Sequence, residues 1–264
     1  MIEQSIIISY KESDEDRRRN LKRILSYLSE LLDYLSKLLN NETEIILVEQ
    51  GDVSKINWLD EFEKKKQINH IFLKNKGIFN KGWGYNVGAN EARGQYLIFN
   101  DIDVFLPFDK YYGSLTQMPF FDVINPYNKI FFLNSQNTEK FISNKYDFNN
   151  IDPLSPHYLP GVISGGIFLM KKKSFLMIKG FDEECYGYGH EDDIFDMKIK
   201  KLGSRIQYRD GTAAHIFHQV DKTDNDYYSR INFNADLFKQ YQQITSEQLR
   251  TKIRNLDYFG RKKI

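Results

Sequence analysis

The sequence has 264 residues, of which 41% are hydrophobic and 15% aromatic, so the chain can bury a sizeable core. Its 37 basic and 36 acidic residues give a formal net charge of +1, which argues against nucleic acid as the main partner. The single cysteine, Cys185, excludes an intramolecular disulfide framework and fits a reducing compartment.

Strands and helices are predicted to alternate along the first hundred residues. An apolar run at 5–9 indicates a buried strand, and leucines and isoleucines at helical spacing follow it from Leu21 to Leu39. Further strands are expected at 44–49, 69–74 and 95–99, with a short helix at 86–93. This alternation favours a Rossmann-like α/β fold, a mostly parallel central sheet flanked by helices, with ligands at the carboxyl ends of its strands.

The second half of the sequence is less regular. Residues 106–160 are rich in aromatic residues, asparagine and proline, and predict a substrate-side insertion with loops. A strand with two glycines at 163–170, a helix beginning near Glu191 and a strand at 213–217 are expected to return to the core. A helical tail is predicted from Tyr227. Residues 1–264 therefore predict one composite domain.

Two carboxylates, Asp101 and Asp103, bracket one apolar residue directly after the fourth predicted strand. A hard divalent cation takes oxygen ligands and keeps positions open for water and substrate phosphates, so such a pair suits a metal site completed by a nucleotide. The same spacing also occurs by chance in acidic loops. The pair alone therefore does not establish a metal site.

A second acidic motif, Gly187-Tyr188-Gly189-His190-Glu191-Asp192-Asp193, opens the predicted helix. One interpretation is that its acids only stabilise the helix N-terminus, each by a few tenths of a kcal/mol. The other is functional: the glycines let the ring of Tyr188 move onto a sugar, while a neighbouring carboxylate takes a proton from an attacking hydroxyl.

Histidines 215 and 218 lie near the end of an apolar run, and they are either metal ligands or ordinary buried histidines. Lys11, Lys81 and the arginines at 17–19 either bind phosphate or are solvated. Phe79 either stacks on a base or packs at the sheet edge. These residue types fit a nucleotide site, but each has a purely structural alternative.

Taken in order, these motifs resemble the β-1,4-galactosyltransferase family and related bacterial inverting glycosyltransferases with the glycosyltransferase-A fold. The resemblance covers about residues 5–220. It is carried by Phe79-Asn80-Lys81, Asn86-Val87-Gly88, Asp101-Ile102-Asp103, Gly165-Gly166, Gly180-Phe181, the acidic motif at 187–193 and the histidines at 215 and 218. It implies a nucleotide-sugar-binding half at 1–104, an acceptor and catalytic half at 105–220, and a helical extension at 221–264.

The resemblance also implies roles for individual residues. Asp103, His215 and His218 would bind Mn²⁺ or Mg²⁺, and Asp101 would support this site or the donor ribose. Asp192 would be the catalytic base and Glu191 a contact to the donor sugar or the acceptor. The donor nucleotide and sugar would be contacted by Tyr10, Glu49, Phe79, Lys81 and the loop aromatic Tyr188.

We therefore expect a metal-dependent inverting glycosyltransferase that moves a hexose or N-acetylhexosamine from a UDP-sugar to a hydroxyl of a glycan or glycolipid. Ile163 stands where galactose-specific members carry tyrosine, and its smaller side chain leaves room for an N-acetyl group. The alternatives are a metal-dependent nucleotidyltransferase or hydrolase, and a non-catalytic sugar-nucleotide-binding module.

We also expect a bacterial enzyme of surface polysaccharide synthesis, because the sequence is rich in isoleucine, lysine and asparagine. No apolar run is long enough to span a membrane, which predicts a cytoplasmic location. The basic tail at 261–263 allows at most peripheral contact with the inner face of a membrane.

Overall fold

The computed structural model describes residues 2–62, 67–151, 156–159, 161–163, 165–219, 225–256 and 259–261. Two sheets organise this part of the chain, one of seven strands and one of four. The strands of the larger sheet are β1 (Ile2–Lys11), β2 (Glu42–Gly51), β3 (Ile68–Lys74), β4 (Tyr96–Asn100), β6 (Val123–Asn125), β9 (Ile167–Lys171) and β10 (Ile206–Tyr208).

The seven-stranded sheet has the order β10-β6-β9-β4-β1-β2-β3. All its neighbouring strands are parallel except that β9 runs antiparallel to both β4 and β6. The prediction of a mostly parallel central sheet is therefore confirmed. Because β1, β2, β3 and β4 are parallel, their carboxyl ends meet at one edge of the sheet.

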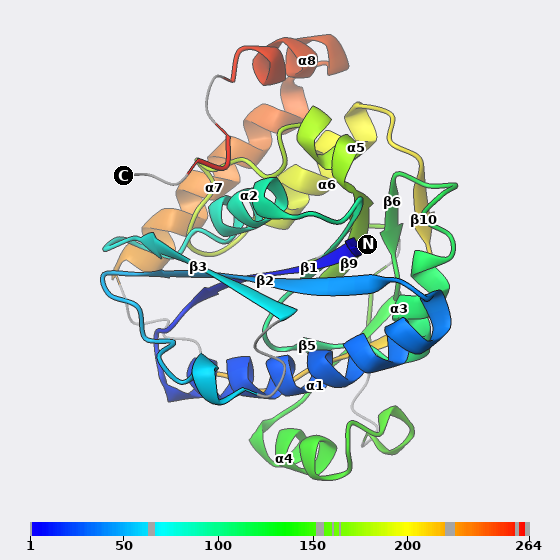
Figure 1. The fold of residues 1–264 in the computed structure, drawn as a ribbon. Helices are drawn as coiled ribbons and strands as arrows, with labels where there is room; N and C mark the ends of the chain where they lie inside the picture. Colours follow the sequence, from blue (N-terminus) through cyan, green and yellow to red (C-terminus); the bar gives the residue numbers. More distant parts are fainter. Residues whose placement is uncertain are drawn as a thin grey trace.

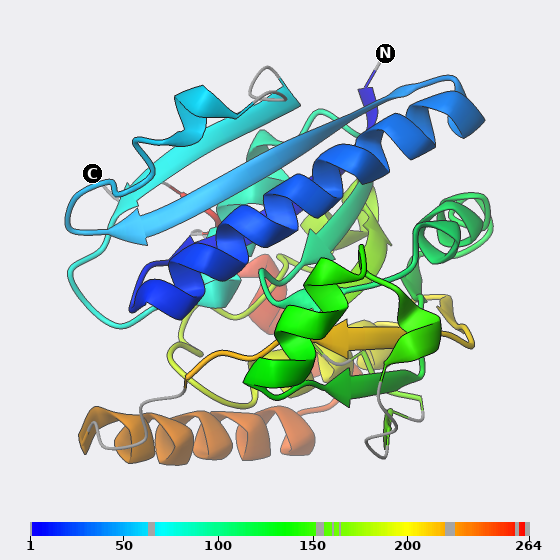
Figure 2. The same ribbon diagram turned by 90° about the horizontal axis from the view of Figure 1, so that it is seen from below.

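Helix α1 (Glu15–Leu39) covers one face of this sheet (Figures 1 and 2). The side chain of Asp14 accepts a hydrogen bond from the backbone N–H of Arg17, which caps the first turn, and Asn40 ends the helix in the left-handed conformation. The predicted apolar stripe is buried from Leu21 to Leu35, whereas Leu39 is only partly buried. This stripe packs on isoleucines and leucines of β1 and β2.

The opposite face of the sheet is covered by α2 (Lys81–Glu91), α5 (Lys172–Met177) and α6 (Glu191–Lys201) (Figure 1). An aromatic cluster fills this interface. The ring of Phe99 stacks on Phe168 with 4.6 Å between centroids, and Phe181 stacks on Phe195 at 4.2 Å. These contacts fix α6, and with it the acidic motif, against the central strand β4.

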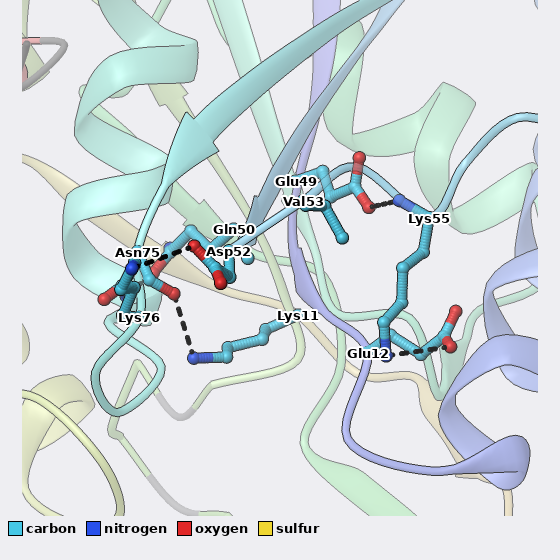
Figure 3. Close-up of a pocket in the computed structure, with 10 residues that line it drawn as sticks. Lys11, Glu12, Glu49, Gln50, Asp52, Val53, Lys55, Asn75 and Lys76 are labelled. Atoms are coloured by element: carbon cyan, nitrogen blue, oxygen red, sulfur yellow. Dashed lines mark hydrogen bonds and ion pairs between the residues drawn. The ribbon is translucent and has the colours of Figure 1, made fainter.

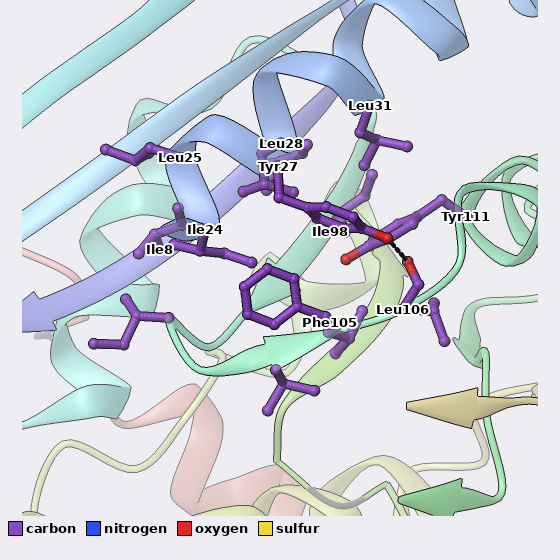
Figure 4. Packing of buried hydrophobic residues seen from close by; sticks show 14 of the residues in the cluster. Ile8, Ile24, Leu25, Tyr27, Leu28, Leu31, Ile98, Phe105, Leu106 and Tyr111 are labelled. Carbon is purple, nitrogen blue, oxygen red and sulfur yellow. Dashed lines mark hydrogen bonds between the residues drawn. The ribbon is translucent and has the colours of Figure 1, made fainter. Parts of the chain in front are cut away.

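The four-stranded sheet has the order β5-β11-β7-β8, and its strand β5 lies just above α1 in Figure 1. Figure 4 shows Phe105 beneath the helix beside Tyr27, whose hydroxyl donates to the carbonyl of Leu106 at 2.5 Å; the two rings are 5.0 Å apart. The sheet comprises β5 (Val104–Phe105), β7 (Lys129–Phe132), β8 (His157–Tyr158) and β11 (Thr212–His215).

The region predicted as loops thus contributes strands to both sheets, together with helices α3 (Phe108–Leu115) and α4 (Ser135–Ser143). The sequence did not predict these strands, which are only two to four residues long and too short for a period to be visible. Helix α2 also begins at Lys81 rather than at 86. The Asn80 side chain caps it by accepting from Trp83 N, while three glycines in the helix hide its periodicity.

The helical tail is confirmed as α7 (Asn225–Gln243) and α8 (Ser246–Arg254). The remaining short elements are 3₁₀ turns at Leu59–Glu61 and Phe148–Asn150. No helix within the described ranges is both long and apolar enough to cross a bilayer. Lys262 and Lys263 of the basic tail lie outside the described residues, whereas the ring of Phe259 packs 6.1 Å from Phe175.

Candidate functional site

The turn between β4 and β5 carries Asp101 and Asp103 at the carboxyl edge of the large sheet. Asn100, which is fully buried, holds this turn: its side-chain amide donates to the carbonyls of Asp101 and Val104, and its oxygen accepts from Tyr111 at 2.5 Å. The backbone N–H of Asp101 donates to Gly166 at 2.7 Å. The turn is therefore rigid before any ligand binds.

Asp103 meets His215 and His218, as the sequence predicts for a metal site. Nε2 of His215 lies 3.7 Å from Asp103 Oδ1, and Nε2 of His218 lies 3.4 Å from Asp103 Oδ2. One ligand atom from each residue lies within 4.8 Å of the others. These three side chains, which we call the Asp103 cluster, offer one oxygen and two nitrogen ligands.

The backbone around the histidines is held from several sides. Ile216 N donates to the carbonyl of Asp103 at 2.8 Å, and Phe217 is bonded through its N–H to Thr138 and through its carbonyl to Asn20. Nδ1 of His218 faces the carbonyl of Gln219 at 2.9 Å. A proton on Nδ1 leaves the Nε2 lone pair directed at Asp103, which is the arrangement that a metal ligand needs.

Arg17, from the first turn of α1, also reaches this cluster. Its Nη1 lies 2.6 Å from Asp103 Oδ2, although 86 residues separate the two in sequence. Burial opposes ionisation of the Asp103 carboxyl, but its contacts with His215, Arg17 and His218 hold its pKa below the ordinary value. The guanidinium thus contacts the same oxygen that a cation would use.

A second group of charges lies around Lys81. Its Nζ is 3.0 Å from Glu191 Oε1, 3.1 Å from Asp192 Oδ2 and 3.6 Å from Asp101 Oδ2. The hydroxyl of Tyr85 donates to Asp101 Oδ1 at 2.5 Å. We call Lys81, Asp101, Glu191 and Asp192 the Lys81 cluster; it joins α2, the end of β4 and the start of α6.

One ammonium cannot neutralise three carboxylates, and the acids respond differently. Burial, with the negative charges of Glu191 and Asp101 and against the attraction of Lys81, raises the pKa of Asp192 to about 7. For Glu191, the contact with Lys81 outweighs burial and lowers the pKa. Asp192 is therefore the acid of this cluster that gains or loses a proton near neutral pH.

The loop before α6 is held by α7. The side-chain amide of Asn234, which is 1% exposed, donates to the carbonyls of Tyr186, Tyr188 and Gly189 at 3.1, 3.2 and 2.9 Å. The Tyr188 side chain is 58% exposed. The loop thus has a tethered backbone and an exposed side chain at Tyr188.

A pocket of about 290 Å³ opens at the ends of β1, β2 and β3 (Figure 3). Glu49 lines it and is bound by the Ser54 hydroxyl at 2.6 Å, by Lys55 N at 2.7 Å and by His70 Nε2 at 3.0 Å. The other lining residues are Lys11, Glu12, Gln50, Gly51, Asp52, Val53, Lys55, Asn75 and Lys76.

Tyr10 and Phe79, which the resemblance assigns to the donor nucleotide, are not among the residues that line this pocket. Tyr10 is 1% exposed and packs in the core beneath α1, and its hydroxyl donates to Glu12 at 3.3 Å. Phe79 is partly buried, and its carbonyl accepts from Gly187 N at 2.8 Å, which ties the segment before α2 to the loop before α6.

The sequence does not predict the contacts made by Arg17, Asn234 and Tyr85. Arg17 is one of three consecutive arginines, and only the phase of α1 distinguishes it from its neighbours. Asn234 carries no local signal in a polar helix. Tyr85 shares a glycine-rich segment with Lys81, and its distance from Asp101 depends on the packing of α2 against β4.

The central sheet flanked by helices matches solved structures with the glycosyltransferase-A fold. The catalytic domain of Drosophila β1,4-galactosyltransferase 7, solved with xylobiose, is similar with a TM-score of 0.50 and 15% identity, over 94% of this chain and 84% of that one. Residues 1–349 of TarS from S. aureus give a TM-score of 0.56 and 16% identity, over 96% and 69%. The fold prediction is confirmed.

The family model described as "Glycosyltransferase like family 2" matches residues 19–224, so the chain belongs to this family of sugar-transferring glycosyltransferases. A curated Drosophila melanogaster relative, named "Putative polypeptide N-acetylgalactosaminyltransferase 13", is 24% identical over 244 residues. The aligned region covers 81% of this chain and 42% of the relative's length.

Proposed function

We propose that this glycosyltransferase is metal-dependent and inverting, and that it moves a hexose or N-acetylhexosamine from a UDP-sugar to a hydroxyl of a glycan or glycolipid. The observation that carries the proposal is that one rigid turn, Asp101 to Asp103, belongs to both charged clusters. A cation site and a carboxylate able to accept a proton are thereby brought to the same edge of the sheet.

The Asp103 cluster fits a divalent cation such as Mn²⁺ or Mg²⁺. Its carboxylate oxygen and two imidazole nitrogens lie within 4.8 Å of one another, and these are ligand types that such an ion accepts. A bound ion there would neutralise negative charge on the diphosphate leaving group. One of the structural neighbours was solved with manganese, UDP-Gal and xylobiose, which supports this choice.

Asp192 is proposed as the general base. Its side chain is 25% exposed, so an acceptor can approach it. The acceptor hydroxyl gives its proton to Asp192 while its oxygen attacks the anomeric carbon from the face opposite the nucleotide. The bond between that carbon and the diphosphate oxygen breaks, UDP leaves, and the configuration is inverted.

The pocket at Glu49 is proposed to receive the uridine. A carboxylate fixed by three partners suits recognition of a polar base edge, and Lys11 supplies positive charge at the rim. For the sugar, we propose that Ile163 leaves room for an N-acetyl group. Ile163 is buried two residues before Gly165, where a Cβ atom would lie 2.1 Å from Asp192 Oδ2. The relative named as an N-acetylgalactosaminyltransferase favours testing such donors first.

Calorimetry of the metal-free protein with UDP-sugars, with and without Mn²⁺, tests the donor and metal assignments. Binding that requires Mn²⁺, followed by UDP release, is the expected result. Release of pyrophosphate, or binding without turnover against a glycan library, would contradict a glycosyltransferase. The anomeric coupling constant of the isolated product decides between inversion and retention. Surface polysaccharide synthesis in a bacterium is the proposed context, and bacterial oligosaccharides should lead the acceptor library.

A further inference from the structure

Lys81 is enclosed by acids. Its ammonium has three N–H donors, and three carboxylates lie between 3.0 and 3.6 Å from Nζ. Its side chain is only 13% exposed. Each donor therefore has a carboxylate available, and a fourth anion at Nζ would have to displace one of them.

The surrounding backbone is shaped around this contact. A Cβ atom at Gly165 would lie 2.1 Å from Asp192 Oδ2 and 2.9 Å from Lys81 Nζ, so only glycine lets the chain pass this close to the pair. Asp101, the third acid, is fixed by Tyr85 and by the rigid turn after β4. Lys81 starts α2, whose first turn is capped by Asn80. The ion pair is thus fixed by its neighbours on each side.

The cluster carries more negative than positive charge. From the elements packed against it, Asp192 faces Lys81 of α2, Glu191 of its own helix and Asp101 of the turn after β4. Lys81 is the cation that favours the ionised form of Asp192, and both other groups oppose it. Removing the ammonium would leave three carboxylates together in a poorly solvated site.

We propose that Lys81 is a positioning residue for the general base, which it keeps ionised and oriented through a direct ion pair, and that it does not anchor the donor diphosphate. This inference rests on the proposed function, in which Asp192 accepts the proton. It differs from the role that the family resemblance implies for this position. Diphosphate binding is then the task of other cations at the strand ends.

Carbon-13 NMR of protein labelled at the aspartate carboxyl carbons tests the pairing, with the Asp192 signal identified by its loss in Asp192→Asn. In Lys81→Met, the midpoint of Asp192 should rise by about 1 to 3 pH units. Lys81→Arg should return it most of the way, and Lys11→Met, which removes a lysine at the pocket rim, should leave it unchanged. An unchanged midpoint in Lys81→Met would overturn the proposal.

Affinity for UDP with Mg²⁺, measured by calorimetry, separates the two roles of Lys81. A positioning residue predicts a dissociation constant within about threefold of the native protein in Lys81→Met, whereas loss of a phosphate anchor predicts weakening of about tenfold or more. Tenfold weaker binding in Lys81→Met, with native affinity in Lys81→Arg, would overturn the proposal.

The native protein provides a measurement that does not depend on the folding of a variant. If saturating UDP and Mg²⁺ drew Lys81 away, the Asp192 midpoint would rise by a unit or more, and the proposal would fail. A midpoint within about 0.3 units would support it. Because the titration needs no turnover, a normal titration together with inactivity toward every UDP-sugar would withdraw the proposed function and leave the ion pair established.

Discussion

The Asp103 cluster and the Lys81 cluster lie on either side of one turn, and they have opposite ratios of charge. In the first, one carboxylate is surrounded by a guanidinium and two imidazoles. In the second, one ammonium is surrounded by three carboxylates. The first cluster therefore suits the proposed cation site, and the second suits the proposed proton acceptor.

The consequences for the acids follow from these ratios. The pKa of Asp103 is lowered, so its carboxylate is ionised over the physiological range and available to a metal. The pKa of Asp192 is raised to about 7 by burial and by Glu191 and Asp101, which Lys81 only partly offsets. Both carboxylates occupy poorly solvated positions. The difference between their pKa shifts therefore comes from the number of like charges near each of them.

The largest expected effect is that of Asp192→Asn. It removes the proton acceptor and should lower the rate of transfer by about 10²- to 10⁴-fold, with UDP and metal affinity kept. Asp193→Asn is the matched control, since Asp193 is the next residue, is exposed and pairs with His190. Rates with the donor found by calorimetry check this. Equal losses in both variants would remove the base assignment.

The next largest effect is expected for Asp103→Asn, which should change the Asp103 cluster and leave the Lys81 cluster as it is. It removes the ionised metal ligand and should weaken Mn²⁺ binding by more than about 100-fold, because even indirect partners of metal ligands cost 10- to 100-fold. The Asp192 titration should change little. Native Mn²⁺ affinity in this variant would show that the ion binds elsewhere. Asp109→Asn, on the surface helix α3, controls for loss of a charge.

The rate of sugar transfer should depend on pH through the ionisation of Asp192 in the Lys81 cluster. Asp192 accepts a proton only when ionised, and its raised pKa means that the ionised fraction falls as the pH drops through about 7. The rate should therefore be level above that value and fall about tenfold per pH unit below it. The residual rate of Asp192→Asn should lack this limb. A native profile level down to pH 5 would contradict the assignment.

The smallest expected effect concerns Arg17, which contacts Asp103 Oδ2 as a cation would. Arg17→Gln removes this competitor, so Mn²⁺ affinity should rise by up to about tenfold, and the metal-free protein should melt at a lower temperature because a largely buried carboxylate loses its partner. Arg19→Gln, which breaks only an exposed pair with Asp16, is the control. Weaker Mn²⁺ binding in Arg17→Gln would show that Arg17 assists the ion.

Much of the fold could be predicted because it is encoded locally. The apolar runs of β1 to β4, the leucine stripe of α1 and the acids that open α6 are each visible within one element. In the smaller sheet only β11 was predicted, as a strand at 213–217. The strands β5, β7 and β8 were not, since two to four residues show no period. Short sequence motifs were enough to identify three acids as candidates for the site, namely Asp101, Asp103 and Asp192.

The sequence by itself thus determined which residue types stand at the ends of the strands and the start of α6. Only the tertiary structure decided their partners. Arg17 and Asp103 are 86 positions apart, and Lys81 and Asp192 are 111 apart. Such pairs form only where strand order and helix packing bring the two residues together. Water weakens the attraction between two charges, which becomes small once a few ångströms of solvent separate them. Local pattern therefore supplies the charged groups, and topology decides which of them meet.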